Sequence, residues 1–327
     1  MRFKKLLFIV LLSGCLETSA CAADFLFYLE AQGVGGYSSR ESDVVYYSKT
    51  REDVMQKPSL GVDYLQKFSG DSGDVAAIAL QARVAYDLEG TDNAEPQLYN
   101  AYFRYKSGWS DLWIGHNRPS LGLSSYFDSH GLLLDTLAMN QFGFDRDWGV
   151  GAYRDFSWGN IGVSLTTGTG MPIYFKGNYL ASARISKGTL SQDNYNLGFS
   201  MAYGKTPDTM GYHLMNDEPM RFAVAGTDFT YLWNNLESRM EIMGGRNKDE
   251  ETYAAFWRFG INLLDEGRLK LEVQPALWKI ASDRNYQISA GPSFMLTGDI
   301  TLRAMYLYDH NTDDHRVIMQ IYYYRKL

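Results

Sequence analysis

The sequence predicts an all-β fold in which sixteen antiparallel strands close into a transmembrane β-barrel. The first observation behind this prediction is a two-residue alternation, clearest between positions 195 and 203. Apolar side chains fall on one face of that strand and small or polar ones on the other: Tyr195, Leu197, Phe199, Met201 and Tyr203 against Asn196, Gly198, Ser200 and Ala202. The pattern recurs in segments long enough to cross a bilayer at a tilt of roughly 45°.

The second observation is an aromatic-rich composition without a long apolar segment. The chain is 15% aromatic and contains 24 Tyr, yet its mean hydropathy is only -0.29. No segment after the N-terminal leader has the roughly 18 consecutive apolar residues that a transmembrane helix requires. A barrel reconciles these facts, because only alternate residues face lipid and Tyr and Trp gather at the two interfaces. The formal net charge of -7 argues against a nucleic-acid partner.

The third observation is an alternation of short and longer connections between the candidate strands. Six tight turns rich in Gly, Asn, Asp and Ser lie at 69–73, 107–110, 157–158, 234–235, 264–267 and 297–298. Between them lie connections that are often longer, at 38–57, 89–96, 119–146 and 205–220. Short periplasmic turns that alternate with longer external loops are typical of outer-membrane barrels.

The strands predicted from these patterns follow one another without a domain boundary. They lie at 25–37, 58–68, 74–88, 97–106, 111–118, 147–156, 159–168, 178–186, 193–204, 221–233, 236–246, 252–263, 268–280, 286–296, 299–309 and 315–326. Their even number returns both ends of the barrel to the periplasmic side. Closure is expected because an open sheet edge in lipid would leave unpaired backbone amides.

The N-terminus predicts a secretory signal peptide over residues 1–23, followed by the barrel over 24–327. A basic start, an apolar run from Leu6 to Leu12 and the small residues Ala20 to Ala22 support this reading. The alternative is a lipoprotein, since residues 12–15 resemble a lipobox that would leave a lipidated Cys15. Both cysteines lie in this leader, so we expect no disulfide, thiolate metal site or covalent haem in the mature chain.

The face opposite the apolar one is predicted to line a charged, water-filled lumen. Its candidate pore-lining residues are Arg83, Arg104, Arg184, Arg239, Arg258, Lys270, Arg303, Glu237, Glu241 and Glu272, with Glu30 and Asp87 on the same face. The alternative role for each is an ion pair that rigidifies the wall.

The connection 119–146 is predicted to be a constriction loop after the fifth strand. It carries Asp128, Asp135 and Asp145 against Arg146, and its segment 131–142 has helical spacing. An acidic loop folded inward opposite wall arginines would create a transverse field that filters solutes by charge. The alternative is an external loop whose acids are solvated.

Motifs for catalysis or metal binding are absent from the sequence. It contains no GxSxG, no HExxH and no phosphate-binding glycine-rich loop. The segment Asp309 to His315 offers oxygen and imidazole ligands, but polar residues are expected in an external loop, and we assign no metal. His130 follows Ser129, although adjacency alone does not make a catalytic pair. We therefore expect no enzymatic activity and no cofactor.

Several short stretches resemble the phosphate-selective porin O and P family. They are Leu98 to Tyr102, Ile114 to Gly122, Arg146 to Val150, and Gly226 to Tyr231 followed by Glu241. The resemblance implies a sixteen-stranded, trimeric porin with a constricting loop. Two features depart from the family: the arginine ladder and lysine cluster cannot be mapped, with no Lys between Ser107 and Phe175, and the chain ends on Leu327 instead of an aromatic residue.

Together these observations predict a passive porin in the outer membrane of a Gram-negative bacterium. Its expected partners are outer-membrane lipid, lipopolysaccharide, small hydrophilic solutes or ions, and further copies of the chain. One alternative is a structural barrel that sheathes a partner, such as an electron-transfer protein. A second is an outer-membrane hydrolase.

Overall fold

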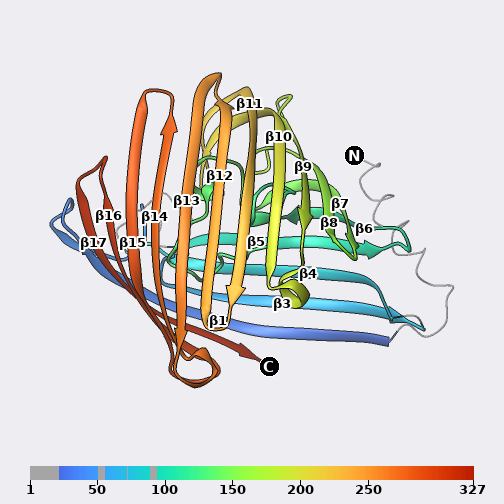
Figure 1. Ribbon diagram of the computed structural model, residues 1–327, viewed down its shortest axis with the longest axis horizontal. Helices are drawn as coiled ribbons and strands as arrows, with labels where there is room; N and C mark the ends of the chain where they lie inside the picture. Colours follow the sequence, from blue (N-terminus) through green and yellow to red (C-terminus); the bar gives the residue numbers. More distant parts are fainter. Residues whose placement is uncertain (1–21, 51–55, 72, 89–93) are drawn as a thin grey trace.

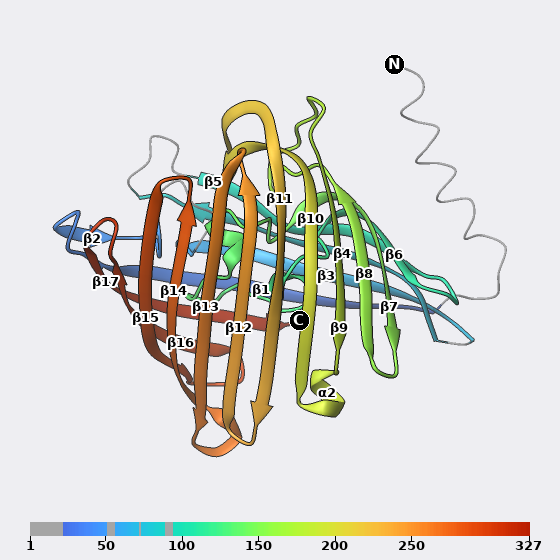
Figure 2. The same ribbon diagram turned by 45° about the horizontal axis from the view of Figure 1, so that its top comes forward.

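A single closed sheet makes up most of the computed structural model (Figures 1 and 2). The structure describes residues 22–50, 56–71, 73–88 and 94–327; the signal peptide predicted at 1–23 lies almost wholly outside them. The strands are β1 (Ala22–Ser38), β2 (Asp43–Val45), β3 (Ser59–Gly70), β4 (Gly73–Tyr86), β5 (Ala94–Lys106), β6 (Asp111–Asn117), β7 (Asp147–Phe156), β8 (Gly159–Thr166), β9 (Tyr179–Lys187), β10 (Tyr195–Met210), β11 (His213–Trp233), β12 (Leu236–Asn247), β13 (Glu250–Leu263), β14 (Leu269–Ile280), β15 (Asp283–Met295), β16 (Ile300–Asp309) and β17 (Asp314–Lys326).

Sixteen of these strands form the barrel, because the three-residue β2 only folds back and pairs with the last three residues of β1. Each barrel strand pairs antiparallel with its neighbours in sequence, and β1 pairs with both β3 and β17. The last pairing closes the ring, with Ala31 opposite Tyr323 and Gly35 opposite Met319. The predicted antiparallel barrel of sixteen strands is therefore confirmed. Closure removes the sheet edges that lipid would leave unsatisfied.

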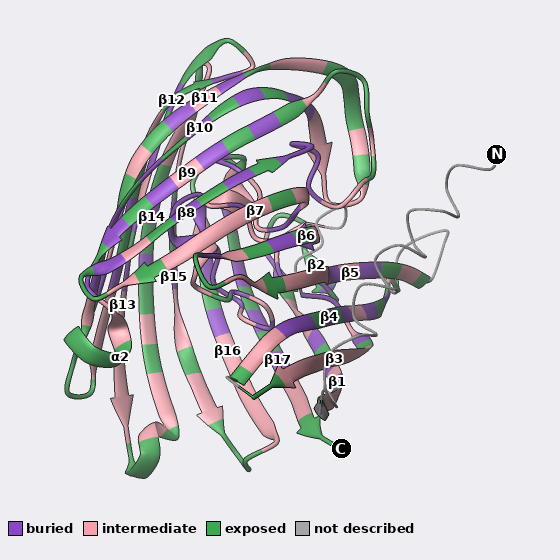
Figure 3. Cartoon of the chain, turned by 90° about the vertical axis from the view of Figure 1, so that its right-hand side faces the viewer, coloured by how far each residue is buried: buried purple, intermediate pink, exposed green. Residues whose placement is uncertain are grey.

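The two faces of the sheet differ as the alternation predicts (Figure 3). On β10, every second residue from Leu197 to Tyr203 is exposed, and the residues between them are buried. Phe199 is 44% exposed, whereas its neighbour Ser200 is 1% exposed. Large apolar side chains thus cover the outside, and small or polar ones point inward. An exterior of this kind is suited to hydrocarbon, because the polar backbone groups are satisfied within the sheet.

The predicted strand boundaries agree with the observed ones to within a few residues, with one large exception. The connection predicted at 205–220 is mostly strand, because β10 continues to Met210 and β11 starts at His213. The pairing register shifts around Asp208, which accommodates Pro207, and Gly211 closes the turn with a φ of 56°. The long hairpin arches over one end of the barrel (Figure 2), where the Tyr212 hydroxyl contacts the Leu98 backbone amide of β5.

The helix expected within 131–142 is reduced to one 3-10 turn, η2 (Leu137–Asn140). A second 3-10 turn, η1 (Leu123–Ser125), occurs earlier in the same connection. Two other short elements lie in turns: α2 (Leu190–Asp193) between β9 and β10, and η3 (Asp265–Gly267) between β13 and β14. Within the described residues, no helix is long and apolar enough to cross a membrane.

Two ends of the barrel can be distinguished by their connections. The short-turn end carries the turns at 157–158 and 234–235, together with the C-terminal end of β17. The long-loop end carries the connection between β1 and β3 and the arching β10–β11 hairpin. The connection after β6 also starts there, but it turns into the barrel (Figure 1).

Candidate pore constriction

The segment between β6 and β7, residues 118–146, is called the constriction loop below. Residues from both halves of the loop pack on the inner wall formed by β9 to β14. Leu121, Leu123, Leu137 and Phe142 are buried there against wall residues Leu180, Ala202, Phe222, Val224, Met243, Ala254, Phe256 and Ala276. Small and apolar residues at these inward positions explain why the loop can lie directly on the sheet.

A second apolar contact fixes the loop to a different part of the wall. Leu133 and Leu134 are buried against Val34, Met305, Leu307 and Ile318 of β1, β16 and β17. Val45 and Tyr47, from the connection between β1 and β3, complete this cluster. The loop, which starts at β6 and ends at β7, is therefore anchored to the wall from β9 to β14 and from β16 to β1.

Polar contacts to the loop backbone reinforce these anchors. The Ser200 hydroxyl accepts a hydrogen bond from the Gly122 backbone amide at 3.0 Å, and the Glu241 carboxylate accepts one from the Leu123 backbone amide at 2.8 Å. Two other wall side chains, Arg258 and Gln274, both donate to the Asp135 carbonyl, at 2.8 and 3.0 Å. Arg303 donates to the Gly131 carbonyl at 3.0 Å. Each bond satisfies a loop backbone group that has no secondary-structure partner.

Wall arginines also stack on two aromatic residues of the loop. The guanidinium of Arg184 lies 4.5 Å from the ring centroid of Tyr126, and that of Arg239 lies 4.2 Å from the ring of Phe127. The Tyr126 hydroxyl donates to Asp228 at 3.1 Å. Such cation–π contacts gain strength where the groups are shielded from water.

Charged side chains of the loop pair mainly with one another. The Asp128 carboxylate lies 2.6 Å from Arg118 and 3.2 Å from Arg146, and Asp145 lies 2.6 Å from Arg146. Arg146 is 1% exposed and also donates to Asn100 of β5 at 3.1 Å. Burial alone would raise the pKa of Asp128, but the guanidiniums of Arg118 and Arg146 hold it well below its usual range.

A β-bulge at Tyr99 shapes the wall opposite this charged cluster. Gln81 is paired with Asn100, and Ala82 with Leu98, so Tyr99 is the extra residue of β5. Because a bulge puts two consecutive residues on one face, Tyr99 and Asn100 both point inward. The Tyr99 ring packs edge-on against His130 of the loop, with the centroids 4.0 Å apart.

His130 of the loop contacts the barrel wall, with its Nε2 atom 2.7 Å from the Glu30 carboxylate of β1. Glu30 is also 3.7 Å from Arg83, whose guanidinium lies 4.7 Å from the Tyr99 ring centroid. Ser129, next to His130, is buried, and no hydrogen bond to its hydroxyl is found among the described residues. The adjacent Ser129 and His130 are therefore not joined as a nucleophile and base would be.

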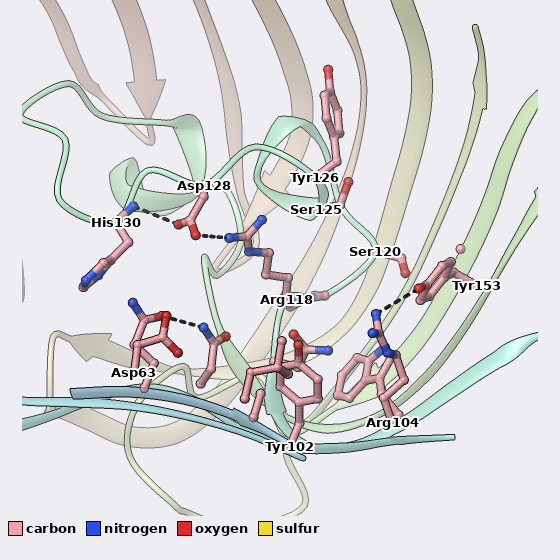
Figure 4. Close-up of a pocket in the computed structure, with 18 of the residues that line it drawn as sticks. Asp63, Tyr102, Arg104, Arg118, Ser120, Ser125, Tyr126, Asp128, His130 and Tyr153 are labelled. Atoms are coloured by element: carbon pink, nitrogen blue, oxygen red, sulfur yellow. Dashed lines mark hydrogen bonds and ion pairs between the residues drawn. The ribbon is translucent and has the colours of Figure 1, made fainter. Parts of the chain in front are cut away.

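The loop divides the space inside the barrel into two chambers. The short-turn chamber has a volume of about 810 Å³ and is lined by Arg104, Arg118, Asp128 and several tyrosines (Figure 4). The long-loop chamber, of about 330 Å³, is lined by Arg146, Asp145 and the arching hairpin. His130 borders both chambers.

The structure places all the candidate pore-lining residues on the inner face, mostly in ion pairs. Arg184 pairs with Asp228 at 2.6 Å, Arg83 lies near Glu30, Arg239 and Lys270 both pair with Glu237, and Lys270 also pairs with Glu272 at 2.9 Å. Arg258, Arg303 and Glu241 hold the loop backbone, as described above. Arg104 differs from all of these, because in the described part of the chain it neither pairs with a carboxylate nor holds the loop backbone, and its hydrogen bond goes to the Tyr153 hydroxyl.

The acidic residues of the loop have partners that the sequence reasoning did not identify. Asp135 pairs at 3.1 Å with Lys49, from the connection after β1, and Asp128 pairs with Arg118, one residue before the predicted loop. Glu30, noted in the sequence only for its inward position, anchors His130. The two-residue alternation could have identified Asp228 as inward-facing, because Asp228 lies two residues from both Gly226 and Thr230 and therefore on the same face of the strand. How these residues act in conduction stays a prediction.

The segment Asp309 to His315 lies at the long-loop end, between β16 and β17. Asp309 accepts hydrogen bonds from the backbone amide and hydroxyl of Thr312, and Asp314 pairs with Arg316. These contacts account for its carboxylates as turn and strand-end residues.

Comparisons with known proteins identify the fold. No family model and no curated protein matches the sequence. Among solved structures, the anion-selective porin from Comamonas acidovorans has a TM-score of 0.63 at 11% identity, over 93% of this chain and 100% of that one. The outer membrane channel DcaP of Acinetobacter baumannii has a TM-score of 0.60 at 13% identity, over 94% and 99%. The trimer form of OmpT, an outer membrane protein of Vibrio cholerae, has a TM-score of 0.59 at 10% identity, over 93% and 100%. The closed sixteen-stranded barrel of this chain thus has the fold of bacterial outer-membrane porins and channels.

Proposed function

We propose that this protein is a passive porin of a bacterial outer membrane, through which small hydrophilic solutes or ions diffuse. The observation that carries the proposal is the constriction loop, which crosses the lumen and leaves a chamber on each side. Arg118 and Asp128 line the short-turn chamber, and Arg146, which pairs with Asp128, lines the long-loop chamber. Fixed charges at a narrow point set which ions accumulate there. No bond needs to be made or broken.

The exterior supports placement in a lipid bilayer. Exposed apolar residues such as Val163, Phe199 and Ile242 lie inside strands, away from their ends, and Trp109, Trp158 and Trp233 are exposed near the short-turn end. Tryptophan at the edge of an apolar band is typical of membrane interfaces. We assign the short-turn end to the periplasm and the long-loop end to the cell surface. Outer-membrane lipid and lipopolysaccharide are then the surrounding partners.

We also propose a homo-oligomer, most simply a trimer. The support is the resemblance of the sequence to a trimeric porin family and the likeness in fold to an outer-membrane protein solved in a trimer form. Phosphate selectivity is not part of the proposal. Most wall cations of the described strands are engaged by carboxylates or by the loop backbone, so these strands offer no continuous row of free cations for an anion to follow.

The chamber volumes argue against the alternative of a barrel that sheathes another protein. Spaces of about 810 and 330 Å³ are of the size that small molecules occupy, not folded domains. Tyr47, Leu133 and Leu134 also fill part of the lumen with the chain's own apolar side chains. A hydrolase is disfavoured because the base candidate, His130, is directed to Glu30, and no hydrogen bond joins it to a serine in the described residues.

Single-channel recording on purified protein in planar bilayers tests the proposal. We expect discrete current steps in KCl from the wild type. A variant that lacks residues 131–142 should give larger steps, because this segment occupies cross-section between the chambers. The matched control removes residues 190–193, the α2 turn at the rim, and should leave the steps unchanged. Folded wild-type protein that gives no current would overturn the proposal.

A further inference from the structure

We infer that the short-turn chamber contains a binding subsite for small zwitterionic organic solutes, such as amino acids with an aromatic side chain. Arg104 would hold the carboxylate, Asp155 the ammonium group, and tyrosine rings the body of the solute. This inference rests on the proposed porin function and names the class of solute that the pore favours.

The cation of the subsite is Arg104, on the inner face of β5. Its guanidinium Nη1 atom donates to the Tyr153 hydroxyl at 3.2 Å, and its Nε atom has no hydrogen-bond partner among the described residues. Arg104 lines the chamber and has no carboxylate within 4.0 Å in the described chain. The other arginines on the chamber wall, Arg118 and Arg184, are each paired with an aspartate at 2.6 Å. A guanidinium without an acid favours a carboxylate ligand.

The anion of the subsite is Asp155, on the inner face of β7. It is exposed, lines the same chamber and has no ion pair to any described residue. Because Tyr153 and Asp155 are two residues apart on one strand, their side chains point the same way, roughly 7 Å apart. Arg104 contacts the Tyr153 hydroxyl (Figure 4). In the strand register Arg104 lies level with Gly151, because both are paired with Trp113 of β6, so the unpaired cation and the unpaired anion lie on either side of Tyr153 along the strand.

The remaining acids near this pair do not change the assignment. Asp111 lies opposite Tyr153 in the β6–β7 register but does not line the chamber. Asp63 lines the chamber farther along the wall, where it accepts the Tyr324 hydroxyl at 2.7 Å. Asp128 is held by two arginines. Arg104 is therefore the arginine of the chamber wall without an ion pair among the described residues, and Asp155 is the unpaired carboxylate on the strand whose Tyr153 it contacts.

Aromatic rings supply the surface for the body of the solute. Tyr102 and Tyr153 flank Arg104, and Tyr28 stacks on Tyr324 with the centroids 4.7 Å apart elsewhere on the chamber wall. Tyrosine rings offer a flat apolar face at low entropic cost, and aromatic partners pack well on them. The chamber volume of about 810 Å³ accommodates a solute of amino-acid size with water around it.

Binding of three matched probes to detergent-purified protein, measured by titration calorimetry, tests the inference. The probes are phenylalanine, 3-phenylpropanoate, which lacks the ammonium group, and 2-phenylethylamine, which lacks the carboxylate. We expect phenylalanine to bind at least about fivefold more tightly than either analogue. In Arg104→Gln, phenylalanine should no longer bind more tightly than 2-phenylethylamine. In Asp155→Asn, phenylalanine should no longer bind more tightly than 3-phenylpropanoate.

Arg154→Gln is the matched control, because Arg154 lies between the two site residues of β7 but points outward, over Trp109 and Phe156. Its affinities should equal those of the wild type. Retention of the heat-dependent shift in gel migration shows that each variant is folded. Equal binding of phenylalanine and 3-phenylpropanoate would overturn the inference in favour of a simple anion site, and so would the absence of any binding. Because binding is measured without current, a protein that conducts KCl but binds no probe refutes this inference alone.

Discussion

Asp128 and Arg146 meet across the partition between the two chambers. Asp128 lines the short-turn chamber, Arg146 lines the long-loop chamber, and their side chains lie 3.2 Å apart. Arg146 is the last residue of the constriction loop, and Asp128 is near its centre. The ion pair therefore closes the loop on itself and places two fixed charges at the partition between the two chambers.

Removal of the loop acids should make the pore more selective for anions. In the variant Asp128→Asn/Asp135→Asn/Asp145→Asn, Arg118, Arg146 and Lys49 lose their counter-charges and attract anions instead. Reversal potentials under a KCl gradient measure the shift. The control Asp249→Asn/Asp265→Asn/Asp283→Asn removes the same charge from exposed positions in turns at the ends of the barrel. An equal shift in both variants would show that total charge, not the loop, sets selectivity.

Reversal of wall charges should separate a conducting role from a structural one. Arg104→Glu is expected to shift selectivity towards cations with little loss of stability, because Arg104 has no acid to leave unpaired. Arg184→Glu breaks the buried pair with Asp228, and the loss of one partner of such a pair costs about 3–5 kcal/mol. Thermal unfolding followed by gel migration should place Arg184→Glu well below Arg104→Glu. Similar stabilities would contradict the pairing described here.

The charge of Asp128 should be insensitive to pH until its flanking arginines are removed. Since Arg118 and Arg146 outweigh burial and lower its pKa, the carboxylate stays ionised when the pH falls to about 4, and the pairs it contributes are lost only below that. Arg118→Gln removes one of the two cations and should raise the pKa. Reversal potentials of this variant should then drift towards anion preference as the pH falls from about 6 to 4. If the reversal potential of the wild type changes by as much over this pH range, the two arginines do not lower the pKa of Asp128.

An arginine on the outer face should impair the barrel more than one on the inner face of the same strand. Val163 is exposed at the middle of β8, whereas Asn160 lines the short-turn chamber. Val163→Arg should cost about 2–4 kcal/mol if it lies at the midplane of the bilayer, and Asn160→Arg much less. Folding yield into lipid vesicles, measured by gel migration, compares the two. Equal yields would argue against a lipid-facing exterior.

The strand pattern could be predicted because it depends on local alternation, which a barrel imposes on each strand separately. The boundaries of β7 were predicted to the residue. The length of the β10–β11 hairpin was underestimated, because Pro207 and Asp208 are typical of turns. The register shift that accommodates them within the sheet depends on the paired strand and cannot be read from the local sequence. The bulge at Tyr99 has no local signal for the same reason.

The contacts of the site were less predictable, because they join segments far apart in the chain. The alternation of inward and outward residues along a strand predicts that Arg83 and Arg184 point inward. It does not predict that Asp228 is the partner of Arg184. Arg118 was missed because the predicted loop began one residue after it. Lys49 reaches Asp135 from a separate loop. Such pairings depend on how two connections pack inside the barrel, which no strand pattern encodes.

The wall residues Arg258, Gln274 and Arg303 hold the constriction loop by its carbonyl oxygens, at positions 135 and 131. A carbonyl is present whatever side chain the position carries. The barrel thus fixes where the loop lies without dictating its side chains at these anchors. Residues that face the solute can be exchanged while the scaffold stays in place, so one wall can serve a range of selectivities over evolutionary time.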